Sequence, residues 1–188
     1  MVIKINYKHL ISFEGIDGCG KSTQIKLLSE KLFNNNINNF IFREPGGSPI
    51  SEKIRRILLD KNNVISSESE TLLFLAARSN LVNEFIEPAI KNDDVILCDR
   101  YFDSTIAYQC YGKGMDLALV SIMNKFAIKN IFPYLTIIFD ISPTIVQDRL
   151  NNKELDRMEL LGLEFQNKVR EGYLELAKTN DRCHIIKC

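Results

Sequence analysis

The stretch of residues 15–22 constrains this chain more than any other part of it. Its sequence, GIDGCGKS, fits the pattern G-x-x-x-x-G-K-[ST]. An apolar run at residues 10–13 precedes the stretch, and Ile25, Leu28 and Leu32 follow it at helical spacing. The alternative is an ordinary tight turn between a strand and a helix. Because the loop spacing and both flanking patterns agree, the sequence predicts a phosphate-binding loop.

The glycines of this loop explain how it would hold a triphosphate. Gly15, Gly18 and Gly20 can adopt positive φ, which lets successive backbone N–H groups point toward the phosphate oxygens. The N-terminus of the following helix also attracts an anion. We expect Lys21 to bind the β- and γ-phosphates of ATP, and the Ser22 hydroxyl to bind Mg²⁺. The predicted ATP-binding residues are Gly15, Ile16, Asp17, Gly18, Cys19, Gly20, Lys21, Ser22 and Thr23.

Five short apolar runs predict the fold class. They lie at residues 10–13, 40–42, 95–98, 135–139 and 184–186, and each adjoins a helical pattern. Such runs are typical of a parallel sheet that is buried on both faces. We therefore predict an α/β fold with a doubly wound, five-stranded parallel sheet and surrounding helices. Since no repeat or linker interrupts the 188 residues, residues 1–188 are expected to form one domain.

Composition excludes several classes of protein. The 24 Lys and Arg residues balance 24 Asp and Glu residues, which argues against a broad nucleic-acid-binding surface. Lys4 and Lys8 interrupt the N-terminal apolar residues, so neither a signal peptide nor a membrane span is predicted. The five cysteines form no C-x-x-C pair, and their odd number fits reduced thiols. We expect a cytoplasmic protein with no membrane and no nucleic-acid partner.

The third apolar run ends in an acid and a base. In a doubly wound sheet, ligands bind at the carboxyl ends of strands, so Asp99 and Arg100 should lie beside the phosphate-binding loop. Asp99 is expected to hold Mg²⁺, and Arg100 to bind the phosphate of a second substrate bidentately. A basic residue at this position favours phosphoryl transfer over hydrolysis. The N-K-x-D motif that a regulatory GTPase needs is absent from the sequence.

A predicted helix that precedes this run carries an aromatic and a basic residue one turn apart. Ser67 and Glu70 form a capping-box pattern, which predicts a helix that runs through Ile86 and ends near Pro88. Phe74 and Arg78 on this helix would suit a nucleobase. The ring of Phe74 can stack on the base, and the guanidinium of Arg78 can donate to a carbonyl of the base. Spacing alone favours the other interpretation, in which Phe74 packs in the core and Arg78 is a surface arginine.

The chain resembles thymidylate kinase, in its bacterial form, at five places. The matching segments are residues 13–23 (FEGIDGCGKST), 43–47 (REPGG), 73–78 (LFLAAR), 99–109 (DRYFDSTIAYQ) and 155–159 (LDRME). The resemblance implies a P-loop nucleoside monophosphate kinase that transfers the γ-phosphate of ATP to dTMP with Mg²⁺. It also implies a homodimer, formed through helices such as the one that bears Phe74. A further helix is expected after the last strand, although the sequence stops at Cys188.

The resemblance assigns roles to individual residues. Phe74 would stack on thymine and Arg78 would bond its carbonyl, while Asp17 would contact the 3′-hydroxyl. Arg43 and Arg100 would bind the dTMP phosphate. The remaining substrate-binding residues are Glu44 and Pro45, which shape the pocket wall through a cis peptide bond, and Ser104, Thr105, Tyr108 and Gln109.

The family resemblance also raises the question of a catalytic arginine. Eukaryotic members carry an arginine inside the phosphate-binding loop, whereas this chain has Gly18 there. A lid at about residues 142–160 must then supply the positive charge, and its candidates are Arg149, Lys153 and Arg157. Together with Lys21 and Arg100, these residues are the predicted catalytic set.

Two other functions fit parts of this pattern. A kinase of another nucleotide or deoxynucleoside would share the phosphate-binding loop and differ in the base pocket. A non-catalytic ATP-binding switch would bind ATP tightly and transfer phosphate to no monophosphate. Arg100 and the full acceptor-side set of residues argue against the switch.

Overall fold

The computed structural model describes residues 6–150 and 156–188, and for residues 6, 7 and 148–150 it describes the backbone alone. Within these residues, one parallel sheet has the strand order β2-β3-β1-β4-β5. The strands are β1 (Asn6–Glu14), β2 (Asn39–Arg43), β3 (Val95–Asp99), β4 (Phe132–Asp140) and β5 (Cys183–Lys187). Each contains one of the five predicted apolar runs, so the predicted parallel sheet is confirmed.

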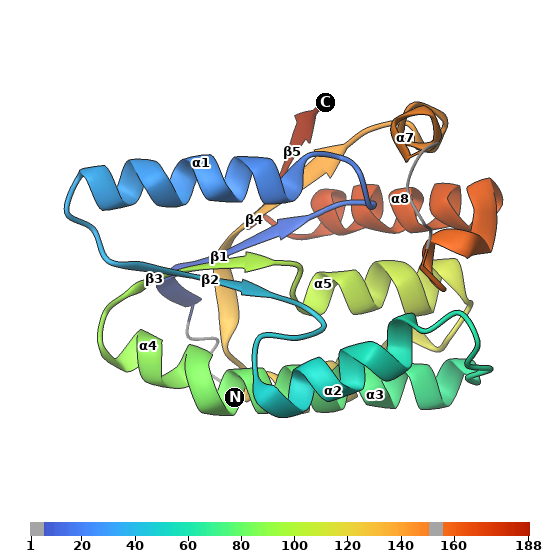
Figure 1. Ribbon diagram of the computed structural model, residues 1–188, viewed down its shortest axis with the longest axis horizontal. Helices are drawn as coiled ribbons and strands as arrows, with labels where there is room; N and C mark the ends of the chain where they lie inside the picture. The colour runs from blue at the N-terminus through green and yellow to red at the C-terminus, as the bar shows by residue number, and fades with distance from the viewer. Residues whose placement is uncertain (1–5, 151–155) are drawn as a thin grey trace.

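Helices connect the strands and cover the sheet (Figure 1). They are α1 (Lys21–Asn34), α2 (Pro49–Leu59), α3 (Ser67–Leu81), α4 (Glu87–Lys91), α5 (Phe102–Thr105), α6 (Leu117–Ala127), α7 (Pro143–Leu150) and α8 (Gly162–Thr179), with π-helical turns η1 (Val82–Ile86) and η2 (Ile106–Gly112) and a 3-10 turn η3 (Glu159–Leu161). None of the helices in the described part of the chain is long and apolar enough to cross a membrane.

Two hydrophobic clusters lie on opposite faces of the sheet. On one face, Leu97 of β3 packs with Ile25 of α1 and Val169 of α8. On the other, Ile96 and its neighbours pack with residues of α3, η1 and α4. Successive residues of a strand point to opposite faces, which explains why Ile96 and Leu97 belong to different clusters. Figure 1 shows α1 and α8 on one side of the strands and α2, α3 and α4 on the other.

The pairing of the central strands sets the position of the candidate site. β1 and β3 are parallel neighbours, and their register places Phe13 beside Asp99. The loop after β1 and the residues after β3 therefore leave the sheet side by side at its carboxyl edge.

The helix from residue 67 differs from the prediction at both ends. Its N-cap is Ser66, whose side chain accepts from the Ser69 N–H, and Glu70 is buried and does not cap. At the other end, η1 carries the helical segment into α4, where Pro88 lies in the first turn. Proline has no N–H to donate to the preceding turn, and the change from the hydrogen-bond pattern of α3 to the π-helical pattern of η1 lies before it.

The two edge strands are less buried than predicted. Phe40 and Ile41 of β2 are 46% and 47% exposed, and Ile185 and Ile186 of β5 are 41% and 46% exposed. An apolar run does not distinguish a central strand from an edge strand, since both are rich in β-branched and aromatic residues. The prediction of a sheet buried on both faces therefore holds for the central strands alone.

Candidate active site

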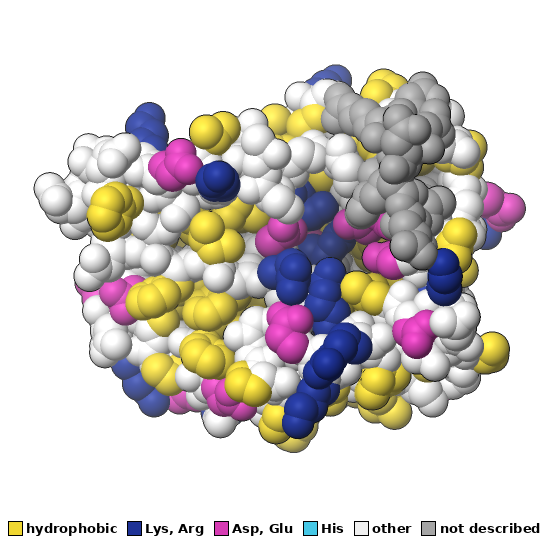
Figure 2. All heavy atoms as spheres, in the orientation of Figure 1, with side chains coloured by type: hydrophobic (Ala, Val, Ile, Leu, Met, Phe, Trp, Pro, Cys, Tyr) yellow, Lys and Arg dark blue, Asp and Glu magenta, His cyan; other side chains and the backbone are white. Residues whose placement is uncertain are grey.

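A cleft of about 420 Å³ opens at the carboxyl ends of β1, β2 and β3. Its size is within the range of small-molecule sites. Predicted site residues that line it are Asp17, Gly18, Gly20, Lys21, Ser22, Thr23, Arg43, Glu44, Pro45, Phe74, Arg78, Asp99, Arg100, Ser104, Thr105, Tyr108 and Gln109. Figure 2 shows Lys and Arg side chains gathered in a hollow on this face, with Asp and Glu side chains at its border.

The phosphate-binding loop has the backbone that its glycines allow. Gly15, Gly18 and Gly20 have φ of 135°, 76° and 99°, as predicted. A Cβ at Gly15 would lie 2.6 Å from the backbone oxygen of Phe139, so a larger residue does not fit. Ile16 and Cys19 are buried and support the loop from behind, which agrees with a packing role for Cys19.

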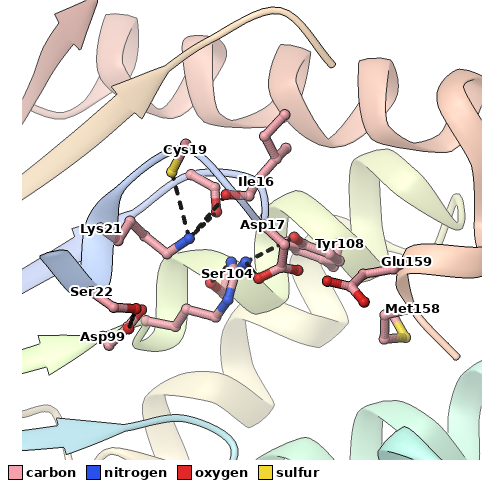
Figure 3. A network of polar contacts seen from close by, with 12 residues as sticks. Ile16, Asp17, Cys19, Lys21, Ser22, Asp99, Ser104, Tyr108, Met158 and Glu159 are labelled. Atoms are coloured by element: carbon pink, nitrogen blue, oxygen red, sulfur yellow. Dashed lines mark hydrogen bonds and ion pairs between the residues drawn. The ribbon is translucent and has the colours of Figure 1, made fainter. Parts of the chain in front are cut away.

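Lys21 points back across the loop (Figure 3). Its Nζ donates to the backbone oxygens of Gly15 at 3.1 Å and Ile16 at 3.0 Å, and contacts the Sγ of Cys19 at 3.6 Å. The side chain is nearly buried, with 5% exposed. A cation held by carbonyl oxygens at the first turn of a helix is placed to bind an anion in the loop.

Ser22 and Asp99 meet where the two neighbouring strands end. The Ser22 Oγ donates to the Asp99 Oδ2 at 2.6 Å (Figure 3). A hydroxyl and a carboxylate are hard oxygen donors of the kind that Mg²⁺ prefers, so the pair fits this ion together with substrate phosphates. Among the described residues, no group of three or more His, Cys, Asp or Glu side chains forms a metal site.

Arg100 extends from the end of β3 into the cleft. Its Nη2 donates to the Asp17 Oδ1 at 2.8 Å and to the Tyr108 hydroxyl at 3.1 Å. The guanidinium carbon lies 5.0 Å from the centre of the Tyr108 ring. Asp17, Tyr108 and Arg100 thus form one wall between the phosphate-binding loop and the rest of the cleft.

Arg78 is held more firmly than a surface arginine. It is 2% exposed, and its Nε donates to the Glu44 Oε2 at 2.6 Å. Its Nη1 donates to Thr105 at 2.6 Å and to Asn124 at 2.7 Å. Core packing with a surface arginine, which spacing alone allowed, is therefore wrong for Arg78. Phe74 is half-buried and lines the same cleft.

Glu44 carries an unusual carboxyl group. The peptide bond to Pro45 is cis, as the family resemblance implied. Within the described residues, the Oε1 of Glu44 is buried without a hydrogen-bond partner. Burial raises the pKa of Glu44 to about 7, and the nearby Arg78 offsets only part of this rise.

This pKa gives a testable pH dependence. A raised pKa means that the folded state keeps a proton that the unfolded state has released, so the contribution to stability is complete below pH 4.5 and is lost as the pH rises through about 7. We expect the free energy of unfolding to fall by about 3 kcal/mol from this group. Glu44→Gln should remove this fall in the free energy of unfolding, which urea unfolding curves recorded from pH 4.5 to 7.5 measure. The same fall in the parent and in the variant would contradict the assignment.

Four cleft residues were absent from the predicted set: Arg55, Leu59, Asp156 and Met158. Arg55 donates from Nη1 to the backbone oxygen of Pro45 at 2.8 Å. It lines the cleft together with Arg43 and adds a second positive charge there. The sequence spacing could have indicated Arg55, because it places this residue on the same face of α2 as the buried residues Ser51 and Leu58.

The candidate lid residues do not lie with the other predicted site residues. Arg157 does not line the cleft. Its Nη2 donates to Glu70, and its Nε donates to the backbone oxygen of Leu58 at 2.7 Å. Lys113 also pairs with Glu70, at 2.7 Å. The side chain of Arg149 and all of Lys153 lie outside the described residues. Glu70, taken from the sequence as a capping residue, is the buried centre of this cluster.

Comparisons with known proteins agree with this geometry. The family model for thymidylate kinase matches residues 13–188. The thymidylate kinase of Thermoanaerobacter sp. (strain X514) is 48% identical over 168 residues, which cover 89% of this chain and 83% of the relative. That of Thermosipho africanus (strain TCF52B) is 48% identical over 176 residues, which cover 94% and 88%.

A solved structure is also similar. The crystal structure of thymidylate kinase from Ehrlichia chaffeensis superimposes with a TM-score of 0.80 at 37% sequence identity. The match covers 97% of this chain and 89% of that one.

Proposed function

Since this chain belongs to the thymidylate kinase family, we propose that it transfers the γ-phosphate of ATP to dTMP and so produces dTDP and ADP. The observation that carries the proposal is the cleft itself. One cleft contains both a phosphate-binding loop, with Lys21, and a second set of cations around Arg100. An enzyme that only hydrolyses ATP needs the first set and not the second.

The donor side of the cleft binds ATP. The N–H groups of the loop surround the phosphates, and Lys21 leaves its carbonyl partners to bind the β- and γ-phosphates. Ser22 and Asp99 would hold Mg²⁺, which supplies positive charge to the phosphate oxygens when it is bound. These residue roles are part of the proposal.

The acceptor side binds dTMP. Phe74 stacks on the thymine ring, and the Arg78 cluster, together with Gln109, presents polar groups to the edge of the base. Arg43 and Arg100 bind the phosphate, and Asp17 contacts the sugar. Arg78 is preorganised for its role because its other donors are held by Glu44 and Asn124.

Transfer follows from alignment and charge. The acceptor phosphate of dTMP is ionised near neutral pH, so its oxygen attacks without a general base. Lys21 and Arg100 hold the leaving and attacking groups in line and stabilise the charge on the transferring phosphoryl group.

Arg157 belongs to the proposed catalytic set, and its pairing with Glu70 gives a specific test. If Arg157 exchanges Glu70 for the transferring phosphoryl group, Arg157→Ala should lower kcat by at least about 10²-fold and change the KM for dTMP little. Glu70→Gln weakens the same pair but keeps the guanidinium, so it should retain most of the parent kcat. Equal losses of kcat in both variants would show that Arg157 serves only the pair with Glu70.

A substrate panel tests the function directly. ADP release should be fastest with dTMP when dTMP, dUMP, dCMP, AMP and GMP are compared at equal concentrations. Equal rates with all five would indicate a less selective nucleotide kinase. Tight ATP binding without transfer to any monophosphate would favour the non-catalytic switch.

We further propose a homodimer in the cytoplasm. Leu72 of α3 is 57% exposed, and Leu119, Ile122 and Phe126 on one face of the adjacent helix α6 are 53%, 66% and 85% exposed. Large apolar side chains exposed together favour a protein interface. The buried cysteines Cys19, Cys98, Cys110 and Cys183 are unbridged, which is typical of a reducing compartment. Sedimentation velocity should give twice the chain mass.

A further inference from the structure

We infer that Glu14, the last residue of β1, is a positioning residue for Arg100. It holds the backbone that carries Arg100 and, through the hydroxyl groups of Ser104 and Tyr173, one nitrogen of its guanidinium. The inference rests on the proposed function, in which Arg100 binds the acceptor phosphate.

The backbone at Arg100 needs this support. Arg100 has a φ of 70°, a left-handed conformation that a residue with a long side chain rarely adopts. The N–H of Arg100 donates to the backbone oxygen of Phe13 at 3.0 Å. The next N–H, that of Tyr101, donates to the Oε1 of Glu14 at 2.8 Å. Two consecutive residues of β1 thus hold the peptide groups on both sides of the strained position.

The side chain of Arg100 is held through two hydroxyl groups. Ser104 donates from Oγ to the Oε2 of Glu14 at 2.6 Å, and the Tyr173 hydroxyl donates to the same oxygen at 3.1 Å. Each hydroxyl has one proton, so a proton directed at Glu14 leaves lone pairs for another donor. The Nη1 of Arg100 donates to both hydroxyl oxygens, at 3.2 and 3.1 Å. Glu14 therefore sets the direction of the whole chain of hydrogen bonds.

The ionised form of Glu14 fits these contacts. Ser12 donates to its Oε1 at 2.8 Å, so together with the N–H of Tyr101 and the two hydroxyl groups four donors converge on the carboxylate. Four donors fill the acceptor capacity of an ionised carboxylate. The pKa of Glu14 is nevertheless raised, first by burial and then by the nearby Asp103, and the bond from Ser104 and the charge of Arg100 offset part of this rise.

Glu14 acts at a distance from the cleft. Glu14 and Tyr173 are 0% and 2% exposed, and neither lines the cleft, whereas Arg100 and Ser104 do. The Nη1 of Arg100 is turned toward this buried network, and the Nη2 toward Asp17 at the cleft. The network therefore holds the Nη1 side of the guanidinium and leaves the Nη2 side, at the cleft, for the acceptor phosphate.

The sharpest test is Tyr173→Phe, which removes one hydroxyl and keeps the ring that packs against Tyr108. We expect the KM for dTMP to rise about fivefold to tenfold, which corresponds to one hydrogen bond, while the KM for ATP stays unchanged. Glu14→Gln keeps the shape of the side chain but loses acceptor capacity, and it should raise the KM for dTMP by more than tenfold. Should Glu14→Gln fail to fold, Tyr173→Phe decides the question alone.

Thr136→Val is the matched control. Thr136 is a buried residue whose hydroxyl bonds Asp103 and Arg182 and makes no contact with Arg100. It should lower the melting temperature and leave both KM values at those of the parent. Folded variants of Tyr173 and Glu14 with the parent KM for dTMP would overturn the inference, as would an equal rise of that KM in Thr136→Val. A parent protein that does not phosphorylate dTMP would instead overturn the proposed function, and the inference with it.

Discussion

Lys21→Met should abolish transfer of phosphate from ATP to dTMP while the protein remains folded. The substitution keeps most of the length of the side chain and removes the positive charge that Lys21 places in the phosphate-binding loop. Lys21 would otherwise neutralise charge on both the leaving and the transferring phosphate, and a loss of this kind costs about 10³-fold or more in kcat. Radiolabelled ATP provides the measurement, as label that appears in dTDP.

The control for this variant is Lys26→Met, on the exposed face of the same helix. It removes a lysine from α1 without touching the loop, so it should transfer label at the parent rate. Circular dichroism of both variants should match the parent. Label that passes at the parent rate in Lys21→Met would contradict the assignment of the loop as the ATP site.

Arg100→Met should lower kcat/KM for dTMP by about 10³-fold. The variant loses the cation that bonds Asp17 and Tyr108 at the cleft, and leaves the carboxylate of Asp17 facing the acceptor phosphate. Removal of one preorganised charged donor costs about 10² to 10³ in rate, and the repulsion by Asp17 adds to this loss. Steady-state kinetics with each substrate varied in turn should show little change in the KM for ATP.

Arg56→Met, an exposed arginine on α2, serves as the matched variant. It changes the net charge equally and should leave kcat/KM for dTMP at the parent value. If the two variants lose activity to the same degree, the effect of Arg100 is a general effect of charge and not of its position in the cleft.

The donor half of the site could be predicted because it is encoded locally. The glycine spacing dictates positive φ at Gly15, Gly18 and Gly20, and a strand end beside that loop places Asp99 and Arg100 near Lys21. For the glycines, the pattern and its backbone consequence lie within a few residues of each other. Asp99 lies 77 residues from Ser22, and its position was predictable because ligands of a doubly wound sheet bind where the carboxyl ends of its strands meet. The parallel sheet was also predictable, since each run of apolar residues is short and adjoins a helix.

Residues whose partners lie far along the chain could not be read from local patterns. Glu70 fits a capping pattern, yet its partners Lys113 and Arg157 come from other elements that only the fold brings together. Tyr173 sits among charged residues of a long helix, and nothing in its neighbourhood indicates that it contacts Arg100.

The parallel pairing of β1 with β3 has a lasting consequence for this enzyme. Neighbouring strands are about 4.8 Å apart, so the backbone sets the spacing at which the loop that carries Lys21 and the residues Asp99 and Arg100 leave the sheet. Substitution of Phe74 or Gln109, which line the same cleft, can thus alter the choice of base without changing this backbone spacing.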